Sequence, residues 1–285
     1  MPHDSACLGL SFFGHQLFYA TSKRGQDAVL NRIGAVDFNF NVPRAILTAQ
    51  KEHIQSLTTA LDDLKDRFNI NQLRVLLYPT MECWSILPKL VYDDAEEREA
   101  HIGILLNGTD RKHIHPAWHT LSKDNFKLLK LRTDDRLRGI KTLTNGTAQT
   151  ELISAFEVGE NWITHARPGG SFMTVGCFHN AISVCSFILG NLRGATYITF
   201  DDPEDLPYLW LQQAQALPWM QGLHEQVQVY GSSAWKIIEI LQPFWDDAGS
   251  VSKMDTLEKM QVTAREQTYS FNLELAYPAI MLALN

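Results

Sequence analysis

Residues 171–200 constrain the fold of this 285-residue chain more than any other segment. The segment is apolar, with interruptions at His179-Asn180 and Gly190-Asn191, and Gly and Asn are typical turn residues. Three apolar runs separated by two tight turns predict a meander of three consecutive strands. Asp201-Asp202-Pro203 follows at once and predicts the start of a helix. The order of three strands and a helix predicts one lobe of an α/β protein.

The same segment resembles a membrane span in length, because residues 171–192 carry no formal charge. The turn residues interrupt the run, however, and the polar residues Thr174, Ser183 and Ser186 lie within it. Two buried strands joined by a turn explain this pattern better than a spanning helix. We therefore expect no transmembrane segment.

The charge of the chain bears on its partners. It has 25 basic and 32 acidic residues, a formal charge of −7, and no block of Lys or Arg. Proteins that bind nucleic acid present a basic patch, so this composition argues against that class. One local basic group is present, made of Arg132, Arg136, Arg138 and Lys141. We expect no nucleic-acid partner.

The four cysteines are Cys7, Cys83, Cys177 and Cys185. None of them forms a C-x-x-C pair, so their spacing indicates neither a zinc site nor a redox motif. No signal peptide is recognisable at the N-terminus. Together these features predict a protein of the reducing cytoplasm.

The first 167 residues predict one lobe. Their apolar patterns and turn residues predict strands at 7–13, 16–21, 28–40, 73–78, 81–90, 126–132 and 151–156, and helices at 51–68, 93–106, 134–143 and 159–166. The helix at 51–68 is clearly amphipathic, with apolar residues at spacings of three and four. Residues 107–147 give the least definite pattern of organisation.

Pro168-Gly169-Gly170 is the strongest linker signal in the chain, and it predicts the boundary between two lobes. We expect a first lobe at 1–167, a second lobe at 168–265, and a C-terminal helix at 266–285 that returns to the first lobe. Beyond the meander, the pattern predicts a helix at 204–217, a strand at 227–230, a helix at 234–244 and a final apolar helix at 271–284. Pro278 lies inside that last helix and predicts a kink.

This order of elements, together with the apolar C-terminal run, resembles the actin-like ATPase superfamily. Within it the chain is similar to PilM-like pilus assembly proteins and to an uncharacterised bacterial family. The strand-to-helix junction at 200–210 and the short helix at 159–166 carry the second similarity. The resemblance is best over 150–285. It implies an α/β, two-lobed actin-like (ribonuclease H-like) fold.

The superfamily binds ATP with three loops, and all three depart from its pattern here. Two hairpins normally carry Asp-x-Gly, whose backbone wraps the phosphates and whose carboxylate positions the metal ion and water. Ser11 and Thr174 stand where those carboxylates are expected, and Ser232 replaces a glycine in the third loop. The resemblance therefore implies degenerate nucleotide loops without meaningful ATP hydrolysis. If ATP binds weakly, the resemblance implies that it contacts Gly14, Gly176, Gly231 and Ser232.

Other site chemistries receive less support from the residues. His113, His115 and His119 have the spacing of a metal site, but no Cys or carboxylate close in sequence completes the ligand set. Gly231-Ser232-Ser233 resembles a hydrolase elbow only superficially, and a serine that caps the following helix explains it better. The acidic residues at 201–205 complement the dipole of a helix start better than they indicate a cation site. We assign no catalytic and no metal-binding residue.

Two classes of function remain open. The first is a non-catalytic actin-like scaffold or adaptor that binds another protein, at a membrane assembly apparatus as PilM-like proteins do. The second is a weak ATP-binding enzyme of the actin-like ATPase and sugar kinase superfamily. For the first class we expect at least one contiguous exposed apolar patch of more than a few hundred Å². Trp219, Phe244 and Trp245 follow or flank prolines at helix ends, and we predict that they form the partner surface.

Overall fold

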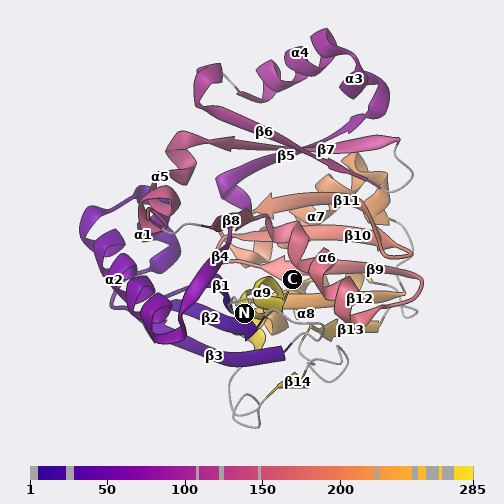
Figure 1. Cartoon of the computed structure of the whole chain (residues 1–285). Coiled ribbons are helices and arrows are strands. Elements are labelled where there is room, and N and C mark those ends of the chain that lie inside the picture. The colour runs from indigo at the N-terminus through magenta and orange to yellow at the C-terminus, as the bar shows by residue number, and fades with distance from the viewer. Residues whose placement is uncertain are drawn as a thin grey trace.

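A computed structural model describes residues 6–23, 29–106, 109–121, 125–146, 149–221, 225–245, 250–254, 263–264 and 273–284 (Figure 1). Over these residues the chain forms three β-sheets of six, five and three strands. The two larger sheets form two lobes, and the small sheet lies against both of them (Figure 1).

The six-stranded sheet contains the N-terminal meander. In spatial order its strands are β14 (Thr263–Ala264), β3 (Val29–Asp37), β2 (Gln16–Lys23), β1 (Ala6–Phe13), β4 (Ile70–Leu76) and β8 (Thr150–Ile153). The first three strands in sequence pair antiparallel, whereas β4 and β8 join in parallel after helical crossovers. Helices α1 (Val42–Thr48), α2 (Lys51–Phe68) and α5 (Asp134–Leu143) pack together beside this sheet. Because β14 pairs with β3, the chain has returned to this sheet by Thr263.

Helix α2 has the bounds that its amphipathic pattern predicts. Its buried residues are Ile54, Leu57, Leu61 and Leu64. These positions recur every three or four residues, so they share one face of the helix. Helix α1 is an addition that the sequence pattern did not predict. Asn41 begins it, with a side-chain oxygen that accepts a hydrogen bond from the Arg44 N–H at 2.9 Å.

The five-stranded sheet contains the predicted second meander. In spatial order its strands are β11 (Asn191–Thr199), β10 (Ala181–Ile188), β9 (Ser171–Cys177), β12 (Gln226–Gly231) and β13 (Ser250–Lys253). The uncharged segment at 171–192 therefore forms strands and turns. Helices α7 (Leu206–Ala216) and α8 (Ala234–Leu241) pack on this sheet and enclose a core that includes Trp210 and Ile237.

The three-stranded sheet accounts for the region that was hardest to interpret from sequence. Its order is β5 (Glu82–Pro88), β7 (Phe126–Thr133) and β6 (Ile114–Thr120), all antiparallel. Helices α3 (Lys89–Asp93) and α4 (Ala95–Leu106) lie on it (Figure 1). Strand β6 has few buried residues and contains Pro116. An edge strand tolerates proline because the backbone N–H groups on its outer side have no strand to pair with.

Helices α6 (Ala155–Ala166) and α9 (Leu273–Leu284) pack against each other between the two large sheets (Figure 1). Helix α9 contacts β1, β2 and β3 of one sheet and β12 of the other, and it continues through Pro278. Gly9 permits the closest approach. A methyl group added there would lie 2.1 Å from the Ala279 carbonyl oxygen. The main core therefore spans both lobes.

Glu82 connects the three sheets. Its carboxylate is fully buried and accepts hydrogen bonds from Arg132 Nε at 2.6 Å, Ser154 Oγ at 2.9 Å and Trp84 Nε1 at 2.9 Å. Arg132 lies on β7 and Ser154 precedes α6. The Glu82 carbonyl accepts from the Tyr197 hydroxyl of β11 at 3.2 Å. A buried carboxylate needs such partners, because desolvation strongly disfavours an unpaired charge.

Gly9→Ala tests the packing of α9. We expect the free energy of unfolding to fall by about 2 to 4 kcal/mol, because the backbone oxygen opposite Gly9 cannot move without displacing α9. Gly103→Ala is the matched control, since a methyl group added on exposed α4 has no neighbour within 4 Å. This control should leave the free energy unchanged or raise it by up to about 1 kcal/mol. Urea unfolding measures both, and equal effects would contradict the packing described.

Glu82→Gln tests the connection between the sheets. The Arg132 guanidinium would remain largely buried without its carboxylate, so we expect a loss of about 2 to 4 kcal/mol of unfolding free energy. The control is Asp135→Asn. The Asp135 side chain is 82% exposed and pairs with Arg138 on the surface. Surface pairs contribute about 0 to 1 kcal/mol, so the control should change little. A loss below 1 kcal/mol for Glu82→Gln would show that the carboxylate is not a structural centre.

Candidate functional site

The β1–β2 turn is the first of the three loops expected around a nucleotide. Ser11 lies in β1 opposite Phe18, fully buried, and its hydroxyl has no hydrogen-bond partner among the described residues. Gly14 adopts φ 57°, a left-handed conformation that glycine tolerates. The Gly14 carbonyl accepts a hydrogen bond from the Val42 N–H at 2.8 Å. The start of α1 therefore holds this turn in place.

The β9–β10 hairpin supplies the second loop. Thr174 is 2% exposed and lies within β9 opposite Cys185, away from the turn. Gly176 faces the Tyr230 ring, and a methyl group there would come within 2.5 Å of the Tyr230 hydroxyl oxygen. In the turn itself, the Phe178 N–H donates to the Ala181 carbonyl at 2.8 Å. That N–H is therefore occupied by the hairpin.

The third loop joins β12 to α8. Gly231 has φ 98°, and a methyl group there would lie 2.3 Å from the Cys177 carbonyl oxygen. The Ser232 N–H donates to that same oxygen at 2.9 Å. Ser233 precedes α8 at φ 58°, and its side chain makes no capping hydrogen bond. Ser233 therefore occupies the N-cap position that the sequence predicted, but its side chain does not cap the helix, because a side-chain cap requires an extended residue at this position.

The structure brings Gly176, Gly231 and Ser232 together beside Cys177, since β9 and β12 pair in parallel with Gly231 opposite Cys177. Gly14 lies in the other lobe. Between the two lobes stand three aromatic rings, Phe13, Tyr78 and Phe178, which we call the aromatic cluster.

The aromatic cluster joins the two hairpins. The Phe13 and Phe178 rings stack with centroids 5.9 Å apart, and the Tyr78 and Phe178 centroids are 4.9 Å apart. All three side chains are buried. The Tyr78 hydroxyl donates to the Phe12 carbonyl at 2.6 Å, and burial raises the Tyr78 pKa, so the phenol stays protonated. Hydrocarbon therefore occupies the junction at which the first two loops meet.

The three loops carry few ionisable side chains. Residues 11–16, 174–181 and 229–234 contain no Asp, Glu, Lys or Arg. Across the described ranges, no group of three or more His, Cys, Asp or Glu side chains could hold a metal ion. A divalent cation takes carboxylate and other oxygen ligands, and phosphates are bound by cations and free N–H groups. These loops present a backbone framework with little charge.

Solved structures share this architecture. A chain of the PilM-PilN type IV pilus biogenesis complex superposes with a TM-score of 0.69 at 11% identity, covering 98% of this chain and 97% of that one. A Bacteroides thetaiotaomicron protein with an actin-like ATPase fold and unknown function gives 0.51 at 11%, covering 87% and 91%. The cytoplasmic domain of EpsL, an inner membrane component of the Vibrio cholerae type II secretion system, gives 0.51 at 10%, covering 90% and 92%.

The chain has the actin-like fold. The α/β, two-lobed fold predicted from the order of elements is confirmed. No protein-family model and no curated protein sequence matches the chain. At these identities the structural likeness establishes the fold alone, so the degeneracy of the nucleotide loops stays a prediction.

The three histidines that were considered as metal ligands lie beside carboxylates instead. His115 Nε2 lies 2.8 Å and His113 Nδ1 3.2 Å from the oxygens of Asp134. Lys141 also contacts Asp134. Its hydrogen bond lowers the pKa of Asp134 most, and the hydrogen bonds from His115 and His113 lower it further. His119 lies apart, 2.8 Å from Glu160. The structure therefore does not bring the three histidines to one site.

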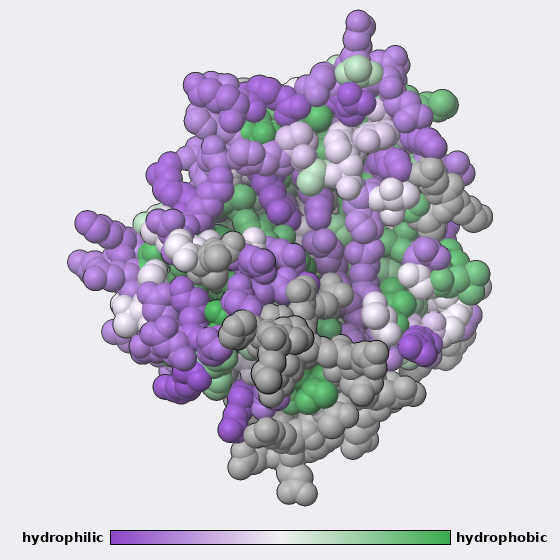
Figure 2. Space-filling view, in the orientation of Figure 1, coloured by the Kyte–Doolittle hydropathy of each residue, from purple (hydrophilic) through white to green (hydrophobic). Residues whose placement is uncertain are grey.

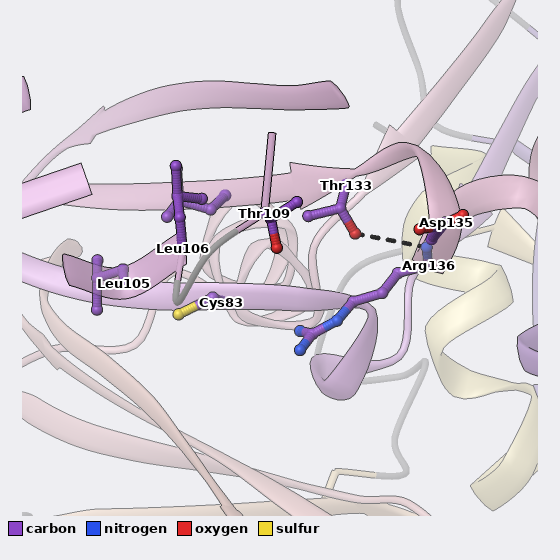
Figure 3. A pocket seen from close by; sticks show the side chains of 8 residues that line it. Cys83, Leu105, Leu106, Thr109, Thr133, Asp135 and Arg136 are labelled. Carbon is purple, nitrogen blue, oxygen red and sulfur yellow. Dashed lines mark hydrogen bonds between the residues drawn. The ribbon is translucent and has the colours of Figure 1, made fainter. Parts of the chain in front are cut away.

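A small hollow lies where α4 and α5 approach the three-stranded sheet (Figure 3). It has a volume of about 380 Å³, and Leu105, Leu106, Thr109 and other residues line it. The Arg136 guanidinium and the Cys83 thiol both lie beside it (Figure 3). Burial raises the Cys83 pKa, which Arg136 partly lowers. The thiol is thus mainly protonated at neutral pH.

The three aromatic residues predicted to form a partner surface differ in exposure. Trp219 is only 9% exposed, contrary to the expectation for a helix end, because its ring lies over Gly194. Phe244 and Trp245 are partly buried and pack against Trp210, with ring centroids 6.4 Å and 6.0 Å away. Sequence spacing did not reveal the large apolar side chains that are most exposed, which include Leu90, Ile104, Leu189, Tyr208 and Trp235.

The buried thiols of β9 and β10 predict alkaline sensitivity. Burial raises the pKa of Cys177 and Cys185, so the folded state keeps both protons where the unfolded chain loses them. Their stabilisation is complete below the unfolded thiol pKa of about 8.5 and is lost above it. We expect the unfolding free energy to fall by about 1.4 kcal/mol per pH unit for each thiol above about pH 9.

Urea unfolding between about pH 8 and pH 10 measures this slope. The double variant Cys177→Ala/Cys185→Ala should start less stable but show a shallower slope, because the contributions of these two thiols are removed while those of the buried tyrosines remain. An unchanged slope in the double variant would contradict the assignment.

Proposed function

We propose that this protein is a non-catalytic actin-like adaptor that binds another protein and does not hydrolyse ATP. The observation that carries the proposal is the aromatic cluster of Phe13, Tyr78 and Phe178. It fills the junction between the hairpins of the two lobes, where the superfamily places phosphates. An enzyme acting there would need charged and polar groups in place of these rings.

Electrostatics supports the same conclusion. Phosphates are strongly anionic, and moving them into apolar surroundings without a counter-charge costs several kcal/mol. The loops offer neither Lys nor Arg to compensate, and the residues at the expected carboxylate positions are Ser11 and Thr174. Both are buried within strands, so neither is placed to hold a hydrated magnesium ion. Positioning and charge stabilisation are the main contributions of a phosphoryl-transfer enzyme, so loops without charged side chains support the proposal that this chain is not one.

The solved relatives support a protein partner. One belongs to the PilM-PilN pilus complex and another is the cytoplasmic domain of a secretion-system component. We propose a comparable place for this chain, beside a membrane assembly apparatus. None of the described helices is long and apolar enough to span a membrane. The four cysteines are free thiols, which fits the reducing cytoplasm.

Trp219, Phe244 and Trp245 remain the proposed partner residues. Phe244 and Trp245 expose part of their rings beside Trp210, and Trp219 lines a groove at the other end of α7. Partly exposed aromatic rings beside a hydrophobic core are typical anchors of protein interfaces.

A weak ATP-binding enzyme is the second candidate. The convergence of Gly176, Gly231 and Ser232 beside Cys177 favours it, because both glycines fit positions that a side chain would overfill. This framework could hold a nucleoside without supporting hydrolysis.

ATP titration separates the two candidates. We expect neither measurable heat on adding Mg-ATP in calorimetry nor phosphate release above a buffer blank, because the loops lack carboxylates and cations. Phe178→Ala, which opens the aromatic cluster, should remain inactive for the same reason. Circular dichroism confirms that both proteins are folded. Magnesium-dependent phosphate release that Ser232→Trp abolishes would refute the adaptor and favour the enzyme.

A further inference from the structure

A groove of about 730 Å³ lies where the small sheet approaches the β10–β11 hairpin. Ile86 of β5, Phe126 of β7 and Leu217 after α7 line it, together with Leu189 and Trp219. Phe126 is 46% and Leu189 75% exposed. Figure 2 shows an apolar area at the right-hand edge of the molecule, over the ends of β10 and β11, on a largely hydrophilic face. The volume lies within the range of ligand sites.

The conformation and exposure of Leu189 are both unfavourable for the stability of the isolated protein. Leu189 has φ 49° and precedes Gly190 at φ 78°, so the β10–β11 turn has two left-handed residues. Hairpins of this type favour Asn-Gly, because a branched apolar side chain is strained at a positive φ. Leucine here is therefore disfavoured by its backbone and also exposes a large apolar surface to water. A partner that covers the side chain would offset both costs.

Two polar groups of the groove lack partners. Arg193 is exposed, and its side chain makes no ion pair or hydrogen bond with any described residue. The indole N–H of Trp219 is buried and likewise has no acceptor within the described chain. Buried donors are normally paired, so this N–H is an unsatisfied donor that is closed to solvent in the unbound protein. No Asp or Glu lines the groove, which makes it complementary to an anionic group.

The backbone of the groove favours an extended peptide. Strands β11 and β5 are both edge strands in the described sheets, pairing only with β10 and β7 respectively. Tyr197 joins them at one end through its hydrogen bond to Glu82. Toward Ile86 and Arg193 the groove opens between the two edges. Edge strands offer unpaired N–H and C=O groups that an extended peptide can pair with, whereas an enclosed cavity would suit a small lipid better.

We propose that this groove binds an extended peptide of a partner protein, with bulky apolar side chains against Phe126 and Leu189 and a carboxylate against Arg193. The proposal rests on the adaptor function and gives it a location and a partner chemistry. It also gives Trp219 a role as a wall of the groove.

The test begins with a library of short random peptides that carry free C-termini, selected against the wild-type protein. We expect enriched peptides with large apolar residues and a carboxylate, binding with micromolar affinity in fluorescence anisotropy. Leu189→Asn should weaken binding at least about tenfold. The same variant should keep or raise the melting temperature, because asparagine tolerates the left-handed turn. Loss of binding would then not reflect loss of folding.

Ile104→Asn is the matched control, since Ile104 is 79% exposed but lies on α4, away from the groove. It should leave peptide binding unchanged. Arg193→Gln tests the carboxylate contact. With the wild type, a peptide acid should bind about tenfold more tightly than its amidated twin, and with Arg193→Gln the two should bind alike.

Several outcomes would overturn the proposal. One is that wild type and Leu189→Asn enrich the same peptides equally. Another is that Arg193→Gln leaves the ratio of the affinities for the peptide acid and its amide unchanged. A third is that dodecanoate displaces the bound peptide at lower concentrations than unlabelled peptide does. Dimerisation of the wild type that Leu189→Asn abolishes would assign the groove to a second copy and also overturn it. A partner protein bound equally by both proteins would overturn the groove alone, whereas ATP hydrolysis would overturn the adaptor function without bearing on these peptide measurements.

Discussion

The buried carboxylate of Glu82 is the interaction on which the arrangement of the three sheets depends. It lies on β5 and binds Arg132 of β7 and Ser154 at the start of α6, while its backbone carbonyl holds Tyr197 of β11. Each partner belongs to a different packing unit. A fully buried charge tolerates little displacement of its donors, so the position of the small sheet relative to both lobes is fixed. The hollow beside Arg136 and the groove beside Arg193 both follow from that position.

The packing between the lobes also bears on the proposed function. In an actin-like fold the two hairpins face each other across the site that holds a nucleotide. Here Phe13 and Phe178 stack across that junction, and Tyr78 fixes one edge of the stack through Phe12. Aromatic packing rigidifies the junction, whereas a nucleotide site must open to admit its ligand. This packing thus favours a single relative position of the lobes, which suits the proposed scaffold that presents a fixed surface.

The proposed peptide groove is also a surface that the fold holds in a fixed position. Its walls come from β5, β7 and the β10–β11 hairpin, and Glu82 and Tyr197 hold these elements together. Preformed grooves bind peptides with less loss of conformational freedom than surfaces that must first be ordered. Leu189 is the residue that connects stability to function, because its left-handed backbone is a local cost that the isolated fold does not require.

The sequence by itself determined the elements whose signals are local. The period of α2, the turns that separate β9, β10 and β11, and the breaks between the N-terminal strands depend on residues close in the chain, and those elements formed where expected. From their order the actin-like fold followed. The strand at 126–132 and the helix at 134–143 were also predicted, as β7 and α5 confirm. Only the tertiary structure decided that β6 pairs with β7, that Ser233 is left-handed, and that Trp219 packs over Gly194 instead of facing water. The aromatic cluster and the Glu82 centre were equally invisible in the sequence. Their members are separated by up to 165 positions for Phe13 and Phe178, and no local pattern specifies which distant strands meet, because burial and pairing are properties of the completed fold.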